Sequence, residues 1–103
     1  MIRVTVSYPT TADASFDHGY YETKHRALVQ SLMGPHGLVR VEMDRYLSDG
    51  RGQLAPVVAA AHLLFTDMAS FQAAMAAVGK TVNADIRNYT SIVPSILISE
   101  TVA

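Results

Sequence analysis

The sequence contains no cysteine. It therefore has no disulfide framework, no thiolate nucleophile and no cysteine-based zinc or iron–sulfur site. The absence of disulfides also suits a reducing compartment.

The sequence also lacks a large excess of charge and a long apolar run. The formal net charge is -1, and the lysine and arginine residues are scattered, so there is no basic field of the kind that attracts nucleic acid or an anionic membrane. No segment approaches the roughly 20 consecutive apolar residues that a membrane-spanning helix needs. We therefore expect a soluble, cytoplasmic protein that binds neither nucleic acid nor a membrane.

Apolar residues are abundant in a short chain. They make up 50% of the 103 residues, which is enough for one hydrophobic core but leaves no room for a second. The sequence predicts a single domain over residues 1–103.

The N-terminal third of the chain changes from a two-residue to a helical period. Alternation of apolar and polar residues predicts a strand from Ile2 to about Tyr8. After a loop that begins at Pro9, Ser15 or Asp17 caps a helix that ends in the Gly-rich segment 34–37. The side of this helix that faces the core is predicted to carry His18, Tyr21, His25, Leu28, Val29 and Leu32.

The rest of the chain predicts three more strands and a second helix. Strands are expected over Leu38–Leu47, 57–65 and 95–99, with Val39, Val41 and Met43 on one face of the first of these. Asp67 caps a helix that begins at residue 68 and has Gly79 as its C-terminal cap. Residues 80–94 are predicted to be irregular, with one short helical turn at most.

This order, β-α-β-β-α-β, predicts an α+β protein of the ferredoxin-like class. Two helices would cover one face of a four-stranded antiparallel sheet. The other face would carry the mixed polar residues Arg3, Thr5, Ser7, Arg40, Glu42 and Asp44. Because such a face needs water or a second subunit, we expect a homodimer in which two sheets close into a barrel.

Three separated segments resemble the ethyl tert-butyl ether degradation (EthD) family. They are "YPTTADASFDHGYYETKHRALV", "HLLFTDMASFQAAM" and "ADIRNYTSIVPSILISE". The sequence departs from the family pattern at Ala27 and Arg87, where proline is usual, and at Leu97, where glutamine is frequent. The resemblance implies a dimeric α+β barrel with a ligand cavity inside each monomer, between helices and sheet. It does not imply one reaction, because family members accompany an oxygenase system and related ones look like decarboxylases or dehydratases of aromatic intermediates.

Tyr21 and His25 are the candidate catalytic residues. They are four residues apart, so in a helix both side chains project from the same face. Phe16, Leu28 and Phe65 could line the cavity, and His25 could transfer a proton near neutral pH. The alternative is structural: His25 would donate to a backbone carbonyl or to Tyr21 and fix the helix in place.

Three other polar residues are placed by their position in the predicted elements. Asp17 is expected to cap the helix, with a part in the ligand site as the minority interpretation. Tyr20 is expected at a rim or subunit contact, because it lies about 100° from Tyr21 around the helix. His62 is a candidate ligand-binding residue that would face either the cavity or the dimer interface, depending on the register of its strand.

Several chemistries are disfavoured. The sequence has no Gly-rich loop between a strand and a helix for a dinucleotide or phosphate, and no serine-nucleophile motif. His18 and His25 are seven residues apart and cannot form the i, i+4 pair of a helical zinc site. We expect no metal and no cofactor.

Two functional hypotheses remain open, and with them the question of whether the protein is an enzyme. In the first, the protein is a cofactor-free acid–base catalyst for an apolar or aromatic oxygenated metabolite, with His25 moving a proton and Tyr21 polarising an oxygen. In the second, it is a non-catalytic accessory or carrier protein for a degradation or oxygenase pathway, and the same pocket only binds. A third, minor possibility is that side chains fill the cavity and only the dimer surface functions.

Overall fold

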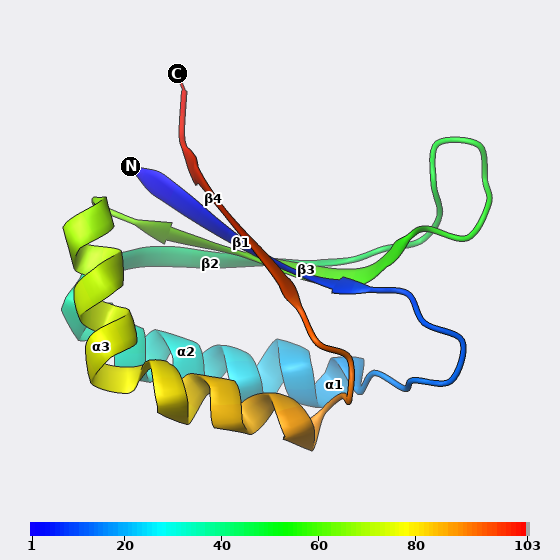
Figure 1. Ribbon diagram of the computed structural model, residues 1–103, viewed down its shortest axis with the longest axis horizontal. Coiled ribbons are helices and arrows are strands. Elements are labelled where there is room, and N and C mark those ends of the chain that lie inside the picture. The colour runs from blue at the N-terminus through cyan, green and yellow to red at the C-terminus, as the bar shows by residue number, and fades with distance from the viewer. Residues whose placement is uncertain (103) are drawn as a thin grey trace.

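The computed structural model describes residues 1–102 and shows two layers, a sheet and the helices that cover one of its faces (Figure 1). The chain follows the predicted β-α-β-β-α-β order, with short helical turns added. The strands are β1 (Ile2–Pro9), β2 (Leu38–Arg45), β3 (Val57–Phe65) and β4 (Ser95–Glu100). The helices are α1 (His18–Tyr20), α2 (Arg26–Met33) and α3 (Met68–Asp85), and the helical turns are η1 (Tyr21–His25), η2 (Gly34–His36) and η3 (Ile86–Asn88).

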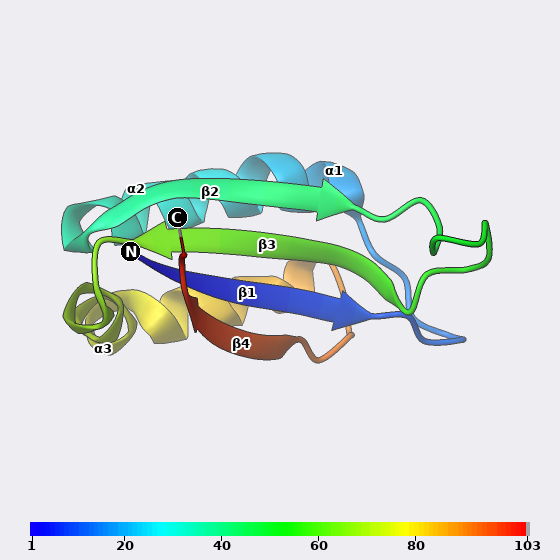
Figure 2. The same ribbon diagram turned by 90° about the horizontal axis from the view of Figure 1, so that it is seen from above.

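The sheet has the strand order β2-β3-β1-β4, and all its pairings are antiparallel (Figure 2). The helical layer lies entirely on one side, with α2 behind β2 and α3 on the side of β1 and β4 (Figures 1 and 2). This is the ferredoxin-like α+β fold that the order of elements predicts.

The alternation along β1 sorts its side chains as predicted. Val4 is buried on the helix side, and its partners across the two ladders are Leu63 and Ile98. Thr5 points to the opposite, open face of the sheet, opposite His62 of β3. Strand residues alternate between the two faces, so the register fixes which polar groups meet on the open face.

The prediction that Val39 shares one face of β2 with Val41 and Met43 is wrong. Its side chain is 50% exposed, whereas Val41 is buried and Leu38 packs against the core. The pairing with β3 has an irregularity between Leu38 and Arg40. Because an irregularity breaks strict alternation, Val39 is displaced from the buried face. The strand also ends at Arg45, two residues before the predicted Leu47.

The first helical segment is continuous from α1 through α2, but its middle turn, η1, is a π-helical turn. The buried residues are spaced by four: Tyr21, His25, Val29 and Met33. In a regular α-helix, a four-residue step advances by 40°, so such a stripe would wind around the helix. A π turn accommodates an extra residue, and with it Val29, which the sequence predicts on this face, and Met33 are buried, whereas the predicted Leu28 and Leu32 are only partly buried.

Gly37 ends this helical segment in a conformation that other residues rarely adopt. Its φ is 89°, and a Cβ atom here would lie 2.8 Å from the Cβ of Ser70 at the start of α3. The glycine therefore allows the left-handed cap at the end of the first helical segment. It also allows this end to approach the start of α3 closely.

Helix α3 is longer than predicted. It passes through Gly79 and ends at Asp85, and η3 follows directly, so residues 80–85 are helical rather than irregular. Gly79 is buried, with Met75 Cε 3.0 Å from where its Cβ would stand. The glycine is kept for this close packing and does not end the helix, since Val82 continues the buried face one turn later.

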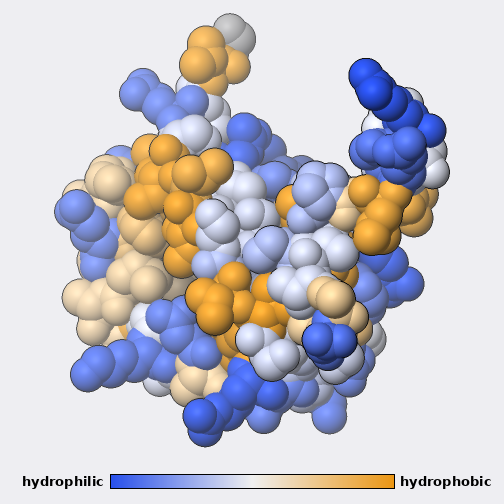
Figure 3. Space-filling view, turned by 45° about the vertical axis from the view of Figure 1, so that its right-hand side comes forward, coloured by the Kyte–Doolittle hydropathy of each residue, from blue (hydrophilic) through white to orange (hydrophobic). Residues whose placement is uncertain are grey.

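The open face of the sheet is flanked by two projections. The loop between β2 and β3 and the C-terminal end of the chain both extend away from the helices (Figure 1). Figure 3 shows the loop at upper right, polar at its tip and apolar nearer the body. The apolar loop residues Leu47 and Leu54 are highly exposed. Within residues 1–102, no helix combines the length and apolarity required to span a membrane.

Candidate functional site

A mostly apolar cavity of about 60 Å³ lies between the sheet and the helices. Its lining includes Val4, Val29, Met33, Met43, Met75 and Ile96, and the polar groups at its wall include Tyr21 and His25. Asn83 of α3 and Ile96 of β4 also line it and are exposed. We infer that the mouth of the cavity opens between α3 and β4.

His25 is a buried polar side chain in this lining, with 5% of its surface exposed. Its Nδ1 lies 2.8 Å from Oδ2 of Asp85, at the end of α3. Its Nε2 forms no hydrogen bond with any residue from 1 to 102. One ring nitrogen is therefore held by a carboxylate, and the residue itself lines the cavity.

Asp85 receives hydrogen bonds on both of its oxygens. Besides the contact of Oδ2 with His25, Oδ1 accepts from the Tyr20 hydroxyl at 2.6 Å and from Asn88 Nδ2 at 2.8 Å. Burial acts to raise the pKa of Asp85, but the hydrogen bonds from Tyr20, Asn88 and His25 outweigh it and lower the pKa. The carboxylate is therefore ionised at neutral pH.

The pKa of His25 is lowered, mainly because burial disfavours the charged ring, although its contact with Asp85 acts in the opposite direction. At neutral pH the ring is therefore neutral and carries one proton. Beside an ionised carboxylate, that proton belongs on Nδ1, which donates to Asp85. The lone pair then lies on Nε2, the atom of a neutral imidazole that can accept a proton.

Tyr21 supplies a hydrogen-bond donor at the same cavity. Its side chain is 1% exposed, and its hydroxyl has no partner among the described residues. Burial raises the pKa of Tyr21, so the hydroxyl keeps its proton. The rings of Tyr21 and His25 are stacked at 15° with their centroids 5.9 Å apart. An unpaired buried hydroxyl is costly, and a ligand oxygen would satisfy it.

An aromatic cluster supports this pair of residues. The hydroxyls of Tyr8 and Tyr89 are 2.6 Å apart, and the ring of Tyr89 lies 4.7 Å from that of His25. Phe16 contacts Tyr8, Tyr21 and Tyr89 edge-on. The cluster holds the rings of Tyr21 and His25 on a rigid apolar side of the site.

Three apolar residues that were expected to line the cavity do not line it in the structure. Phe16 packs behind Tyr21 in the aromatic cluster, and Phe65 is fully buried against Phe71, so neither lines the cavity. Leu28 is only partly buried and does not line the cavity, whereas its neighbour Val29, predicted on the same face, does. Of the predicted site residues, the structure brings Tyr21 and His25 together at the cavity.

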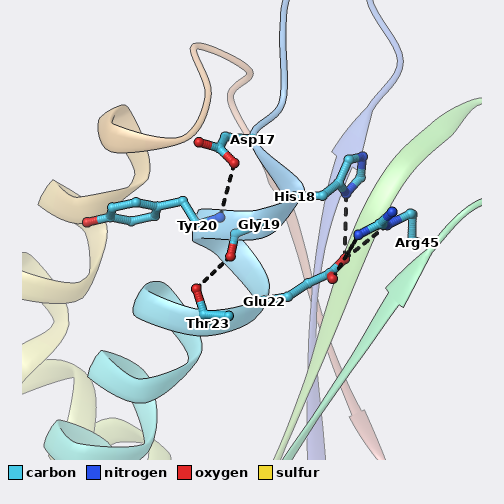
Figure 4. A network of polar contacts seen from close by, with 7 residues as sticks. All are labelled: Asp17, His18, Gly19, Tyr20, Glu22, Thr23 and Arg45. Atoms are coloured by element: carbon cyan, nitrogen blue, oxygen red, sulfur yellow. Dashed lines mark hydrogen bonds and ion pairs between the residues drawn. The ribbon is translucent and has the colours of Figure 1, made fainter.

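Asp17 and Tyr20 also lie outside the cavity lining. Asp17 caps α1, as expected, by accepting from the backbone N–H of Tyr20 at 3.0 Å (Figure 4). Figure 4 shows the Tyr20 side chain pointing toward α3, whereas Glu22 points to the other side and pairs with Arg45 of β2. Tyr20 therefore donates to Asp85 within the chain, and its expected place at a rim or subunit contact stays a prediction.

His62 faces away from the cavity, onto the open face of the sheet. Its Nε2 lies 2.9 Å from Asp44 Oδ2, and its Nδ1 lies 3.3 Å from the Thr5 hydroxyl. The register of β3 with β1 and β2 places it there. Of the two places that the sequence leaves open for His62, the register therefore does not favour the helix–sheet cavity, and the dimer interface stays a prediction.

Asp85 is a site residue that the sequence does not reveal. The segment "ADIRNY" reads as irregular in the sequence, so no helical face can be assigned to Asp85 from it. Asn88 does not satisfy backbone groups, as its place in such a segment would suggest, because its side chain donates to Asp85 and to Tyr20. Methionines 33, 43 and 75 are further lining residues that the sequence does not single out. Among residues 1–102, no cluster of three or more His, Cys, Asp or Glu side chains could hold a metal ion.

The burial of neutral His25 predicts a loss of stability in mild acid. Its pKa is lower in the folded chain than the value of about 6.5 in the unfolded chain, so below that pH the unfolded state binds more protons and stability falls. Asp85 is the charged group that contacts the ring, while the neighbouring Tyr21 and Tyr89 have raised pKa values and stay neutral. Urea unfolding at pH 7.5 and 5.5 measures the effect.

The matched variant for this measurement is His25→Gln, which retains a donor for Asp85 but cannot titrate. The other histidines are the same in both proteins, so the difference between the two pH dependences isolates His25. We expect the unmodified protein to lose more stability between pH 7.5 and 5.5 than the variant. Parallel pH dependences would show that His25 is not buried in the neutral form.

The comparisons with known proteins agree with this fold. The family model described as EthD domain matches residues 9–92. An EthD-like protein from Ralstonia eutropha JMP134 has 34% identity and a TM-score of 0.91, over 99% of this chain and 92% of that one. An ethyl tert-butyl ether degradation family protein from Bacillus halodurans C-125 has 20% identity and a TM-score of 0.78, over 99% of both chains.

A more distant structure has the same fold. It is described as a dimeric ferredoxin-like protein from an uncultured marine organism, with 16% identity and a TM-score of 0.55, over 99% of this chain and 98% of that one. None of the curated proteins matches the chain.

Proposed function

This chain belongs to the EthD family, and from that premise we propose that its cavity binds a small, uncharged, apolar or aromatic molecule that carries an oxygen atom, and that His25 transfers a proton to and from it. One observation carries the proposal. The Tyr21 hydroxyl is buried without a hydrogen-bond partner among residues 1–102, and it lines one apolar cavity together with His25, whose Nδ1 is held by Asp85.

The lining sets the charge and size of the ligand. An apolar wall makes an ionic ligand costly to desolvate, which favours a neutral molecule. The volume of about 60 Å³ is smaller than the roughly 150 Å³ of an engineered cavity that holds benzene. A ring would therefore require Met33, Met43 or Met75 to move, and methionine is the apolar side chain best suited to such repacking.

The proposed proton transfer uses groups of the protein alone. The ligand oxygen accepts a hydrogen bond from Tyr21, and a C–H or O–H bond on the ligand breaks as its proton passes to Nε2 of His25. Tyr21 stabilises the resulting enolate or phenolate oxygen, while Asp85 stabilises the imidazolium. Return of the proton to the same atom or to a neighbouring one restores neutral His25.

The non-catalytic alternative uses the same cavity. In that case the molecule is bound beside Tyr21 and His25 and then released unchanged to a partner enzyme of a degradation or oxygenase pathway. Binding experiments test the site under both hypotheses, whereas proton exchange on a bound ligand separates them.

We also propose that two copies associate through their open faces in the cytoplasm. The face carries both acidic and basic groups, with Arg3 near Glu42, Asp44 and His62 around one depression. Opposite charges on one self-complementary surface suit a twofold contact. Sedimentation at increasing salt concentration tests the association, which should weaken as the charges are screened.

Tyr21→Phe should weaken phenol binding by about 2- to 10-fold, the value of one hydrogen bond of about 0.5–1.5 kcal/mol. Titration of phenol into the protein, followed through the ring signals of His25 by NMR, measures the affinity. Benzene is the matched ligand without oxygen, and its affinity should not fall in the variant.

Tyr46→Phe is the control substitution, because Tyr46 is an exposed tyrosine outside the cavity lining. It should leave both affinities unchanged. If Tyr21→Phe and the unmodified protein bind phenol equally, Tyr21 does not recognise the ligand oxygen. The same holds if the His25 signals do not shift when phenol is added.

A further inference from the structure

We propose that Asp85 is a positioning residue that fixes His25 in the Nδ1–H tautomer and thereby directs the lone pair of Nε2 into the cavity. In its consequence for catalysis, this inference rests on the proposed function of His25. The tautomer itself is a property of the protein without ligand and can be tested independently.

The two carboxylate oxygens of Asp85 contact different partners. Among residues 1–102, Oδ2 has a hydrogen-bond contact only with the His25 ring, at 2.8 Å, while Oδ1 accepts from the Tyr20 hydroxyl at 2.6 Å and from Asn88 at 2.8 Å. The donors come from the helical segment that starts at α1 and from η3, and Asp85 itself ends α3. Contacts from separate elements on both oxygens prevent the carboxylate from rotating away from the ring.

The other tautomer does not fit this arrangement. With the proton on Nε2, the lone pair of Nδ1 would face an ionised oxygen at 2.8 Å, and two acceptors at that distance repel each other. With the proton on Nδ1, the contact is a charge-assisted hydrogen bond of ordinary length. The side chain of Asp85 is only 12% exposed, so water weakens this preference little.

A purely structural role explains the contacts less well. A histidine that only joins two helices has no reason to line a cavity. Here His25 lines one, and its Nε2 has no hydrogen-bond partner among residues 1–102. The same pairing of carboxylate, imidazole and free nitrogen orients the base in serine hydrolases.

Asp85→Asn tests the inference because the network dictates how the new amide must lie. Tyr20 and Asn88 both donate to the position of Oδ1, so the amide oxygen must occupy it, and the amide NH₂ must then face His25. An NH₂ group can pair with Nδ1 only if that nitrogen carries a lone pair. The substitution should therefore move the proton to Nε2.

The tautomer is measured in the ligand-free protein by long-range ¹H–¹⁵N correlation of the imidazole, which distinguishes a protonated from an unprotonated ring nitrogen. The unmodified protein should show Nδ1–H, and Asp85→Asn should show Nε2–H. Glu22→Gln is the matched control: it removes a carboxylate three residues from His25 that pairs with Arg45 instead, and it should not change the tautomer.

Asp85→Glu is the conservative variant and should retain Nδ1–H, because it restores the carboxylate. It also keeps the test decisive if Asp85→Asn fails to fold. An Nε2–H ring in the unmodified protein, or an Nδ1–H ring in folded Asp85→Asn, would overturn the inference.

The tautomer measurement tests the positioning role of Asp85, and a measurement of catalysis tests the proposed function separately. If the tautomer changes in Asp85→Asn and deuterium exchange of a ketone falls sharply, by as much as about 10⁴-fold as in hydrolase triads, both inferences stand. If the tautomer changes in Asp85→Asn but the unmodified protein does not catalyse exchange, Asp85 still positions His25 and the catalytic proposal fails. If exchange occurs but the tautomer is unaffected by Asp85, only the positioning role fails.

Discussion

His25→Ala should slow the exchange of the α-hydrogens of cyclopentanone for deuterium by about 10²- to 10⁴-fold relative to the unmodified protein, the usual contribution of a positioned general base. Cyclopentanone is neutral, compact and mostly apolar, and it carries one oxygen next to acidic C–H bonds. Exchange in D₂O, followed by NMR, detects proton transfer whatever the natural substrate is.

The pH dependence of this exchange should identify the base. A base is active when it is deprotonated, and burial lowers the pKa of His25. The protein-dependent rate should therefore rise with pH and reach half of its maximum at a pH below about 6.5, the ordinary pKa of histidine. A solvent-exposed histidine would give a midpoint near that value.

Two further variants make the result specific to His25. His25→Gln retains a donor for Asp85 without a titratable nitrogen, so it should lose exchange while keeping the fold. His18→Ala removes a histidine outside the cavity lining and should leave the rate unchanged. If the unmodified protein exchanges cyclopentanone no faster than buffer, although phenol still binds beside His25, the carrier alternative replaces the catalytic one.

The fold could be predicted because its signals are local. The alternation along residues 2–8, the Gly-rich stop at residues 34–37 and the Asp67 cap each require only neighbouring residues. The largest error in the elements, the end of the second helix, arises from a glycine that sits close to Met75 in a continuing helix. A glycine kept for packing and a glycine that caps a helix look the same in a single sequence.

The site could be predicted only in part, because half of its geometry is not local. The spacing of Tyr21 and His25 places them on one face of a helix, and both line the cavity. The contact that gives His25 its direction joins residues 60 positions apart, and no periodicity reveals such a pair. Likewise, the face that His62 occupies depends on its pairing with β1 and β2.

Phe65→Ala should lower the free energy of unfolding by about 3–5 kcal/mol, the usual cost of removing a buried phenylalanine ring. Phe65 is completely buried at the end of β3, its ring meets that of Phe71 at 5.4 Å, and it pairs with Ile2 and Leu38 on the neighbouring strands. A domain of this size has only about 5–15 kcal/mol in total. Thermal unfolding should therefore shift by about 4–8 °C for each kcal/mol lost.

This substitution also separates the core from the cavity, two roles that the sequence could not distinguish for Phe65. Because the ring does not line the cavity, the folded fraction of Phe65→Ala should bind phenol with unchanged affinity, whereas Tyr21→Phe should bind it more weakly at nearly full stability. Leu47→Ala, at a side chain that is 93% exposed, controls for the loss of an apolar group and should leave the stability almost unchanged. A Phe65→Ala protein that stays stable but loses phenol binding would place Phe65 in the ligand site and displace the cavity assigned to Tyr21 and His25.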